Sequence, residues 1–543
     1  MKNRNYPFYQ NRKIKSLRDL VDYRSRETPD KTAFSFMNGN IMEKRSYAEF
    51  RQDIECLSCY LRKNHISGHI ALIGENSYSW LLFYFSIIMS GNVVVPLDKE
   101  LNADEIGKLI RRSDCSAFVF SAAFEKDANH LCDDGLGVPC FNMNRMSDFL
   151  SEGGVQTGES GASGGKEPDP DRLACIIYTS GTTGDSKGVM LSENNLICDM
   201  NYSCSIYQIE GPAVAVLPFH HSFGLMTGAL ICMNYGVEVL LNSRIKKLQE
   251  EIKQIKPRTL FFVPAYVQTF NKRILDGIQK SGKMPLHRRL VRFTNALSKV
   301  GINLKPLLLK KQTAVFGGKL KYIICGGAPL EPSLIQSFRD LGINLSNGYG
   351  ITECSPVVSV NRNHYYRDGS VGQLVHGCEV RISDGGEVLV RGGNVMLGYY
   401  KDEAATEEVL IDGWFNTGDL GYLDQDGFLF LTGRTKNLII LENGKNVSPE
   451  ELEEKLQAVP LVKDVVVYSA DGVVTAEIFP DSNYAESQGI KQIYGEIKKC
   501  VTEINGGLPV YKRILSIKIA TEEFDKTTTN KIKRQAFLGG KSK

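Results

Sequence analysis

The segment Tyr178-Thr-Ser-Gly-Thr-Thr-Gly-Asp-Ser-Lys-Gly-Val189 is the most informative stretch of this chain. Serine, glycine and threonine crowd into one short loop, which carries a single lysine, Lys187, and follows the apolar run 173–177. Such a loop offers backbone N–H groups and hydroxyls on one concave surface, which suits a polyphosphate. The sequence therefore predicts a strand that ends in a phosphate-binding loop.

The spacing of this loop differs from that of a P-loop, in which a glycine, four further residues and then Gly-Lys-Ser/Thr follow one another. Here two residues separate Gly184 from Lys187, and Gly188 follows the lysine. The alternative is a flexible turn without a ligand. Glycine-rich turns rarely also carry several hydroxyls and a lysine, so phosphate binding by a loop of another type is favoured.

Length and composition limit the class of protein. A chain of 543 residues is too long for one hydrophobic core, which predicts a large domain and at least one smaller domain. Hydrophobic residues make up 42% and charged residues 23%, as in ordinary soluble globular proteins. The net charge of +3 is small for this length, so we expect no nucleic-acid partner.

The thirteen cysteines have no framework spacing, and free thiols in this number fit a reducing cytosol. Cys56 and Cys59 form one C-x-x-C, but they lie in a helical pattern and are interpreted as buried apolar side chains rather than a redox or metal pair. Residues 1–10 contain no apolar run, so no signal peptide is expected. The nearly apolar stretch 80–97 predicts a buried helix and strand rather than a membrane span. The expected location is therefore cytoplasmic.

Helical patterns alternate with short runs of β-branched residues along most of the chain. Runs of the second kind occur at 70–73, 93–95, 117–120, 213–216 and 322–325. Such alternation is typical of an α/β fold with mostly parallel sheets flanked by helices.

The segment 271–321 stands out by its charge, with thirteen Lys or Arg residues and one acid, Asp276. Apolar residues are interleaved with the basic ones. One hypothesis is a basic amphipathic surface that contacts anionic lipid at the periphery of a membrane. The other is a solvated helix face without a partner, and the sequence leaves both open.

Several further segments combine glycines with groups suited to a nucleotide. Residues 347–353 supply an aromatic ring, a hydroxyl and a carboxylate after a strand-like run, while 326–329 end another strand with small residues. Residues 417–419 place a carboxylate in an expected tight turn, and 433–437 add an arginine and a lysine. A lysine-rich segment, 527–534, lies near the C-terminus. Taken singly, each is better explained as a turn or a solvated surface.

In their order and spacing these segments resemble the core motifs of the adenylate-forming superfamily, which includes acyl-CoA synthetases, peptide-synthetase adenylation domains and luciferases. The resemblance covers the chain from about residue 17 onward. Segments 347–356, 413–421 and 437–447 make it most similar to the long-chain acyl-CoA synthetase branch. It implies a large N-terminal AMP-binding and acyl-substrate domain, residues 1–433, and a small mobile α+β domain, residues 434–543.

The resemblance also implies a role for each matching residue. Thr352 would contact the α-phosphate, Glu353 would ligate Mg²⁺, and His221 would lie beside the reacting carboxylate. Other positions would bind the remaining parts of the nucleotide: Thr179, Ser180, Gly181, Thr182, Thr183 and Lys187 the β- and γ-phosphates, Gly326, Gly327 and Tyr349 the adenine, and Asp419 and Arg434 the ribose.

The C-terminal domain would supply the catalytic lysine, Lys531, which is to bridge the carboxylate and the α-phosphate. Lys436 matches the hinge about which this domain turns, and Gly444 and Lys445 would lie beside a tunnel for the thiol. One position departs from the family pattern, because Asn530 stands where relatives usually have glycine. Asn tolerates left-handed backbone geometry, so the loop is expected to persist, but Lys533 remains an alternative catalytic lysine.

The implied reaction is ATP- and Mg²⁺-dependent activation of a carboxylic acid, most simply a medium- to long-chain fatty acid, followed by thioester formation with coenzyme A. The alternatives are transfer of a fatty or aryl acid to the phosphopantetheine of an acyl carrier protein, and a non-catalytic relative that binds nucleotide or acyl chains. Joint retention of five charged residues argues against the non-catalytic form: Lys187, Glu353, Asp419, Arg434 and Lys531. Candidates for the acyl pocket are Ala265, Tyr266, Thr269, Gly350 and Pro356.

Overall fold

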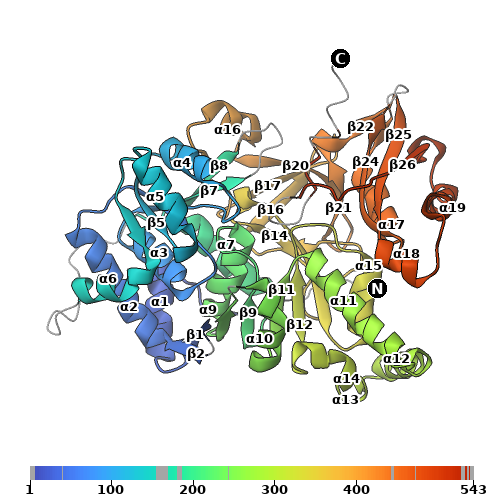
Figure 1. The fold of residues 1–543 in the computed structure, drawn as a ribbon, viewed down its shortest axis with the longest axis horizontal. Coiled ribbons are helices and arrows are strands. Elements are labelled where there is room, and N and C mark those ends of the chain that lie inside the picture. The colour runs from blue at the N-terminus through green and yellow to red at the C-terminus, as the bar shows by residue number, and fades with distance from the viewer. Residues whose placement is uncertain are drawn as a thin grey trace.

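The computed structural model describes residues 7–39, 41–154, 169–179, 186–242, 244–441, 445–470, 472–526, 532–534 and 537. Two large mixed sheets and their helices form an N-terminal region, and a smaller sheet with three helices lies at one end of it (Figure 1). The α/β class is thereby confirmed. Both large sheets also contain antiparallel strands, because meanders and hairpins join the parallel units.

The first sheet has seven strands, in the order β18-β8-β7-β4-β3-β5-β6. Strands β7, β4, β3, β5 and β6 run parallel, whereas β7, β8 and β18 pair antiparallel. The bounds are β3 (His69–Ile73), β4 (Val93–Pro96), β5 (Cys115–Phe120), β6 (Cys140–Asn142), β7 (Leu173–Thr179), β8 (Lys187–Ser192) and β18 (Gly398–Tyr399). The loop expected to bind phosphate therefore connects a β-hairpin.

The second sheet has a parallel half and an antiparallel half. The parallel half comprises β1 (Thr32–Asn38), β10 (Val239–Leu241), β9 (Ala213–Ala215), β11 (Thr259–Phe262), β12 (Tyr322–Cys325) and β13 (Asn344–Gly350), with β2 (Ile41–Ser46) antiparallel at its edge. The antiparallel half comprises β14 (Val357–Val360), β15 (Gly372–Leu374), β16 (Cys378–Ile382), β17 (Glu387–Gly392), β19 (Leu410–Ile411), β20 (Trp414–Leu423) and β21 (Phe428–Arg434). The direction of pairing changes at β13.

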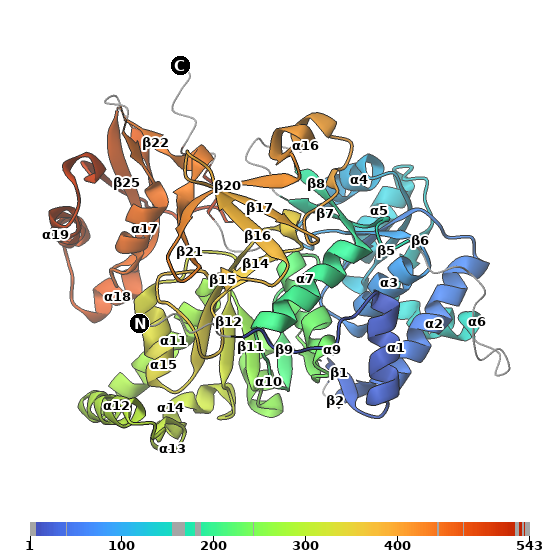
Figure 2. The same ribbon diagram turned by 180° about the vertical axis from the view of Figure 1, so that it is seen from behind.

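Helices cover the faces of both sheets (Figures 1 and 2). The N-terminal helices are α1 (Leu17–Glu27), α2 (Tyr47–Lys63), α3 (Tyr78–Met89), α4 (Ala103–Arg112), α5 (Glu125–Asp133), α6 (Met146–Gly153) and α7 (Glu193–Ile206). The later ones are α8 (Ser222–Leu225), α9 (Cys232–Asn234), α10 (Leu248–Ile255), α11 (Pro264–Lys280), α12 (Met284–Lys299), α13 (Lys305–Leu308), α14 (Lys310–Thr313), α15 (Pro332–Asp340) and α16 (Glu403–Val409).

The apolar stretch 80–97 folds as the sequence predicts. Helix α3 begins after Ser77, whose side chain accepts a hydrogen bond from the backbone of Trp80, and every residue of α3 except Ser79 is buried. Strand β4 follows and is buried throughout. A helix that is apolar on all sides is stable only when protein surrounds it, which accounts for the absence of a polar face.

The described part of the chain contains no helix that is both long and apolar enough to cross a membrane. Cys56 and Cys59 lie in α2, where Cys56 is buried and Cys59 is half-buried. All thirteen cysteines are free thiols.

The C-terminal region packs around its own core, which includes Leu452, Val465, Ile478 and Ile497. Its sheet has the order β24-β25-β26, and a two-stranded ribbon, β22 and β23, precedes it. The bounds are β22 (Ile439–Ile440), β23 (Asn446–Val447), α17 (Pro449–Gln457), β24 (Val462–Ala470), β25 (Val473–Pro480), α18 (Ser482–Ser487), α19 (Ile493–Gly506) and β26 (Ser516–Ile519). This separate core makes it a small α+β domain.

Two local expectations differ from the structure. Thr417–Asp419 lies inside β20 rather than in a tight turn, because alternate residues of β20 are buried and Asp419 pairs with Arg434 of β21. Gly418, at φ +72°, and a register shift between Leu420 and Gly421 interrupt the regular strand geometry. Likewise, the segment Asn347–Gly350 belongs to β13 instead of following it, since its pairing with β14 extends the strand.

Candidate active site

A continuous cleft of about 3090 Å³ separates the N-terminal region from the C-terminal domain. Residues of β7, β8, β12, β13 and β20 line its N-terminal wall, while residues of α17, β24 and the segment 532–534 line the opposite wall. The cleft collects most of the described residues that the sequence singles out: Thr179, Lys187, His221, Gly326, Gly327, Tyr349, Thr352, Glu353, Asp419, Arg434 and Lys436.

A cation, a phenol and a carboxylate follow one another along one side of the cleft. Lys187 Nζ lies 4.6 Å from the ring centroid of Tyr399, within cation–π range. The Tyr399 hydroxyl donates a hydrogen bond of 2.9 Å to Glu353 Oε1. Tyr399 reaches this place because β18 pairs with β8, next to the hairpin that carries Lys187. The sequence offered no signal for Tyr399, which neither a motif nor a periodic pattern marks.

Glu353 is buried, with 8% of its surface exposed. Burial raises the pKa of this carboxyl above its usual range, while the hydrogen bonds from its own backbone N–H and from Tyr399 act in the opposite direction. A carboxyl desolvated in this way gains from a cation nearby, because the charge of the cation favours the ionised form.

A second polar group links three of the predicted residues. The Tyr349 hydroxyl donates to Asp419 Oδ2 at 2.6 Å, and Arg434 Nε donates to Asp419 Oδ1 at 2.6 Å. Burial, followed by the charge of Asp419, raises the pKa of Tyr349, so the phenol stays a donor. The carboxylate is thus held between a ring and a cation, and its register opposite Arg434 fixes the arrangement.

Two glycines, Gly326 and Gly327, leave the backbone of the cleft lining without side chains. Gly326 follows β12, and a Cβ at this position would lie 3.3 Å from Phe223 Cζ. Gly327 has φ +85°, in the left-handed region that glycine adopts at low cost. A planar ring can therefore approach the backbone here.

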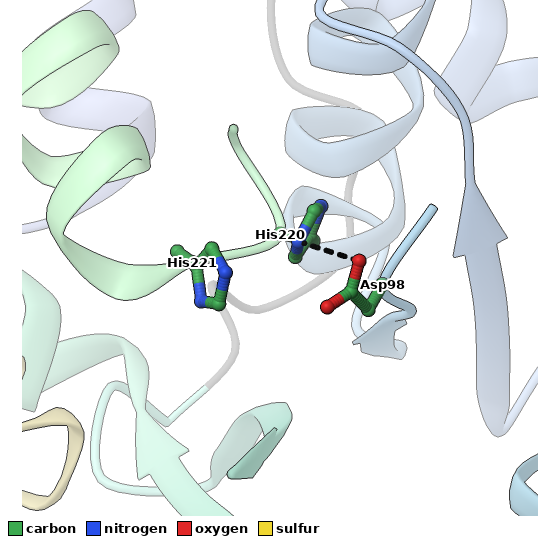
Figure 3. Close-up of side chains that lie close together, drawn as sticks. All are labelled: Asp98, His220 and His221. Atoms are coloured by element: carbon green, nitrogen blue, oxygen red, sulfur yellow. Dashed lines mark ion pairs between the residues drawn. The ribbon is translucent and has the colours of Figure 1, made fainter. Parts of the chain in front are cut away.

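His221 lies at the start of α8, in a cluster with Asp98 and His220 (Figure 3). His220 is buried, and its Nε2 lies 3.2 Å from Asp98 Oδ1. The rings of His220 and His221 have centroids 4.4 Å apart. Asn76 fixes the preceding loop, since its side chain donates to the Leu217 carbonyl at 2.8 Å and accepts from Phe219 N at 3.0 Å.

Next to His221 the chain brings two hydroxyls together. Ser222 Oγ and Thr352 Oγ1 are 3.3 Å apart, one from α8 and one from the turn after β13. Beyond them, residues Met226–Ile231 form a π-helical segment between α8 and α9. Such segments are rare and occur mostly at functional sites. Its residues Thr227 and Ile231 line the cleft.

Small and apolar side chains form part of the cleft lining. All five acyl-pocket candidates, Ala265, Tyr266, Thr269, Gly350 and Pro356, line the cleft. Sequence reasoning missed further lining residues in or next to α7, the π-helical segment and the second sheet: Ser203, Tyr207, Ile209, Thr227, Ile231, Val360 and Val371. These residues come from distant parts of the chain, so no local pattern could have grouped them.

The C-terminal wall is held by ion pairs. Arg534 pairs with Glu453 of α17, and Lys526 Nζ donates to Asp464 Oδ1 at 2.8 Å. Burial raises the pKa of Glu453 to about 7, against the opposing effect of Arg534. Across the cleft, Lys272 Nζ of α11 lies 2.7 Å from Asp481 Oδ2 at the start of α18.

Some predicted residues fall outside the described ranges or away from the cleft. Lys531, Asn530, Gly444 and the loop residues Ser180, Gly181, Thr182 and Thr183 lie outside the described residues. Lys445 is described, but it packs with its Nζ 4.5 Å from the Tyr511 ring centroid and is not among the described residues that line the cleft. Lys533 and Lys436 do line it.

Two curated relatives of this chain are both ligases that act on long-chain fatty acids. The chain is 29% identical over 479 residues to the long-chain-fatty-acid–CoA ligase FadD15 of Mycobacterium bovis. The match covers 82% of this chain and 79% of the relative. It is 27% identical to the long-chain-fatty-acid–[acyl-carrier-protein] ligase AEE15 of Arabidopsis thaliana, with 85% and 76% covered.

The fold is that of a solved enzyme in complex with an acyl-adenylate. The anthranilate CoA ligase AuaEII, crystallised with anthranoyl-AMP, superimposes with a TM-score of 0.77 at 18% identity, over 99% of this chain and 98% of that one. The model of the AMP-binding enzyme C-terminal domain matches residues 436–539. The model of the AMP-binding enzyme matches residues 21–400, which is most of the chain, and the chain therefore belongs to the AMP-binding enzyme family, within the adenylate-forming superfamily.

Proposed function

We propose that this protein activates a medium- to long-chain fatty acid with ATP and Mg²⁺, through an acyl-adenylate, and transfers the acyl group to coenzyme A with release of AMP and pyrophosphate. The observation that carries the proposal is the convergence of the Lys187–Tyr399–Glu353 series and the Tyr349–Asp419–Arg434 group on one cleft whose lining also includes apolar side chains. One group suits phosphates, the other a nucleoside, and the apolar part of the lining suits an alkyl chain.

The proposed residue roles follow from this arrangement. Adenine would stack on Tyr349 above Gly326 and Gly327, and Asp419 and Arg434 would bind the ribose. Lys187 would hold the β- and γ-phosphates together with Thr179, Ser180, Gly181, Thr182 and Thr183. The side chains near the reacting carboxylate would be His221 and Thr352.

The Mg²⁺ ion would be held by Glu353. A buried carboxylate with a pKa raised by desolvation is a hard oxygen ligand of the kind that Mg²⁺ prefers, and a bound cation would offset the cost of its ionisation. The ion would supply positive charge next to the phosphate oxygens. Tyr399 keeps the carboxylate in one orientation by donating to Oε1.

Formation of the adenylate brings two anions together. A carboxylate oxygen attacks the α-phosphorus of ATP, the bond to the bridging oxygen breaks, and pyrophosphate leaves. The reaction needs positive charge placed where negative charge develops. Lys531 would bridge the carboxylate and the α-phosphate, while His221 and Thr352 would fix the orientation of the reacting groups.

Thioester formation needs a different partner in the same pocket. The thiol of coenzyme A loses its proton, the sulfur attacks the adenylate carbonyl, and AMP leaves with the oxygen that came from the acid. We assign residues 1–433 to the N-terminal domain and 434–543 to a mobile domain that turns about Lys436. The turn would withdraw Lys531 and bring Gly444 and Lys445 toward the thiol.

The substrate class is tested by AMP release in the presence of coenzyme A, over acids from acetate through palmitate to benzoates. We expect turnover to rise with chain length, because each methylene buried against the apolar lining contributes about 0.8 kcal/mol of binding. Turnover that is highest with benzoates or acetate would contradict the fatty-acid assignment.

A second candidate acceptor is the phosphopantetheine of an acyl carrier protein. The relative AEE15 of Arabidopsis thaliana, named as a ligase for that acceptor, favours it. Pyrophosphate release that requires the fatty acid, with acyl transfer to carrier protein but not to coenzyme A, would select this alternative.

Glu453 is proposed as a positioning residue for Lys531. Its ion pair with Arg534 attaches the segment 532–534, which follows that lysine in the sequence, to helix α17. Replacing it by Gln should slow adenylation about tenfold, a loss of about 1.4 kcal/mol, and leave thioester formation from supplied acyl-adenylate unchanged. The wild-type adenylation rate should fall as the pH drops below about 7, where Glu453 loses its charge. The variant should lack this step in the pH profile.

A stability measurement separates positioning from unfolding. The pKa of Glu453 is raised in the folded state, so its contribution to stability is present at low pH and is lost as the pH rises through about 7. The Gln variant should therefore be no less stable than the wild type at pH 8. Equal losses in both half-reactions, with a lower melting temperature at pH 8, would contradict the positioning role.

A further inference from the structure

Helices α12, α13 and α14 form a projecting platform at the outer edge of the molecule. They lie below α11 and α15, at the lower right in Figure 1 and at the lower left in Figure 2. We define this basic platform as residues 280–311. Two bonds attach it to α15: Asn295 Nδ2 donates to Asp340 Oδ1 at 2.9 Å, and Lys305 Nζ donates to the Arg339 carbonyl at 2.7 Å.

The apolar residues of the platform face solvent to an unusual degree. Leu286, Phe293 and Val300 of the α12 region are 52%, 53% and 71% exposed, and they recur at intervals of seven residues. That interval places them along one side of a helix. The next segment adds Ile302 and Leu307, at 48% and 72% exposed. By contrast, Thr294 is the buried residue of α12.

The charge of the platform has one sign. The sequence contains no Asp or Glu between residues 277 and 330. Exposed basic side chains flank the apolar ones on the platform: Lys280, Lys283, Arg288, Arg289, Arg292, Lys299, Lys310 and Lys311. A solvated helix face needs no exposed leucine, phenylalanine and valine among such charges, so the alternative of a face without a partner leaves the apolar residues unexplained.

We infer that the basic platform binds the surface of an anionic lipid bilayer, with Leu286, Phe293 and Val300 inserted among the acyl chains and the basic residues at the head groups. An interfacial helix with an apolar face and flanking Lys and Arg has this binding mode. Each Lys or Arg near the bilayer surface adds electrostatic attraction to the negatively charged lipids. A nucleic acid would meet the charges but would leave the apolar row in water.

The basic platform lies close to the cleft, which suggests what a membrane contact would do. Helix α11 runs along the cleft and ends at the platform: Ala265, Tyr266 and Thr269 line the cleft near the start of the helix, and Gln279 lines it near the end. A bilayer on the platform would therefore lie beside one end of the cleft. If the proposed function holds, a fatty acid could pass from the membrane to the site without crossing bulk water. This consequence rests on that function, whereas the binding itself does not.

The test is co-sedimentation of the full-length protein with vesicles of phosphatidylcholine alone and with vesicles that also contain 30% phosphatidylglycerol. We expect binding to the anionic vesicles, weakened by salt, and little binding to the neutral ones. The triple variant Arg288→Glu, Arg289→Glu, Arg292→Glu should lose at least tenfold in affinity. The triple variant Leu286→Ser, Phe293→Ser, Val300→Ser should lose as much.

A matched control carries the same number of charge reversals on another exposed helix, α19, and the segment just before it. The variant Lys491→Glu, Lys498→Glu, Lys499→Glu should bind vesicles like the wild type, apart from a small effect of net charge. Absence of wild-type binding, or equal loss in platform and control variants, would overturn the inference. So would a dimer that only the platform variants disrupt, or binding to duplex DNA in place of vesicles.

Catalysis serves as an independent readout. Adenylation of a short, freely soluble acid without vesicles should be the same in the wild type and the platform variants. Vesicle binding by a protein without ligase activity would leave the platform in place and refute the proposed function instead.

Discussion

Replacing Lys531 by Ala is expected to reduce adenylation at least a thousandfold while thioester formation from supplied acyl-adenylate proceeds at nearly the wild-type rate. The adenylation step requires a cation between two anions, and a preorganised charge of this kind contributes several kcal/mol to the transition state. The thioester step attacks a neutral carbonyl and has no such requirement. The measurement is single-turnover kinetics of each half-reaction separately.

Lys533 provides the matched control for this variant. It stands two residues after Lys531 in the sequence and lines the cleft. Its backbone N–H donates to the Asp525 carbonyl at 2.8 Å. Lys533→Ala should change both half-reactions by less than about threefold, an effect of about 0.6 kcal/mol. If Lys533→Ala removes adenylation and Lys531→Ala does not, the catalytic lysine has been assigned to the wrong residue.

The second large effect is expected for Glu353→Gln. The amide keeps the size of the side chain and can still accept from Tyr399, so the fold should persist, but it cannot hold Mg²⁺ as the carboxylate does. Adenylation should fall about a hundredfold or more, and added Mg²⁺ should not restore it at concentrations that saturate the wild type. ATP–pyrophosphate exchange, measured against Mg²⁺ concentration, gives the result directly.

Tyr399→Phe separates charge from orientation at the same place. The ring remains beside Lys187, but the hydrogen bond to Glu353 is lost. We expect a weaker apparent affinity for Mg²⁺ and a smaller loss of rate than in Glu353→Gln. Normal Mg²⁺-dependent exchange in Glu353→Gln would show that another residue holds the ion.

The sequence predicts best where the chemistry is local. The buried α3 and β4 follow from one apolar stretch, 80–97. The end of β12 just before Gly326 follows from a β-branched run and two glycines. Segment 417–419 was mispredicted as a turn because Thr-Gly-Asp has turn composition, whereas pairing with β21 and alternate burial keep it in a strand. Long-range pairing there outweighs local propensity.

Contacts between distant segments could not be predicted. Tyr399 joins the site only because a two-residue strand pairs with β8, and Asp98 meets His220 only because the end of β4 lies next to the loop after β9. Neither residue carries a motif. The pairing of Glu453 with Arg534 likewise depends on how the C-terminal segment folds back over α17.

The most direct test of the account follows one atom. The protein is incubated with ATP, Mg²⁺, coenzyme A and palmitate in which both carboxylate oxygens are ¹⁸O. The masses of the products are then measured by mass spectrometry. A carboxylate oxygen that attacks the α-phosphorus remains on that phosphorus when the thiol displaces AMP. The account predicts acyl-CoA together with AMP that contains one ¹⁸O atom per turnover. Unlabelled AMP, or ADP with the label in inorganic phosphate, would contradict it.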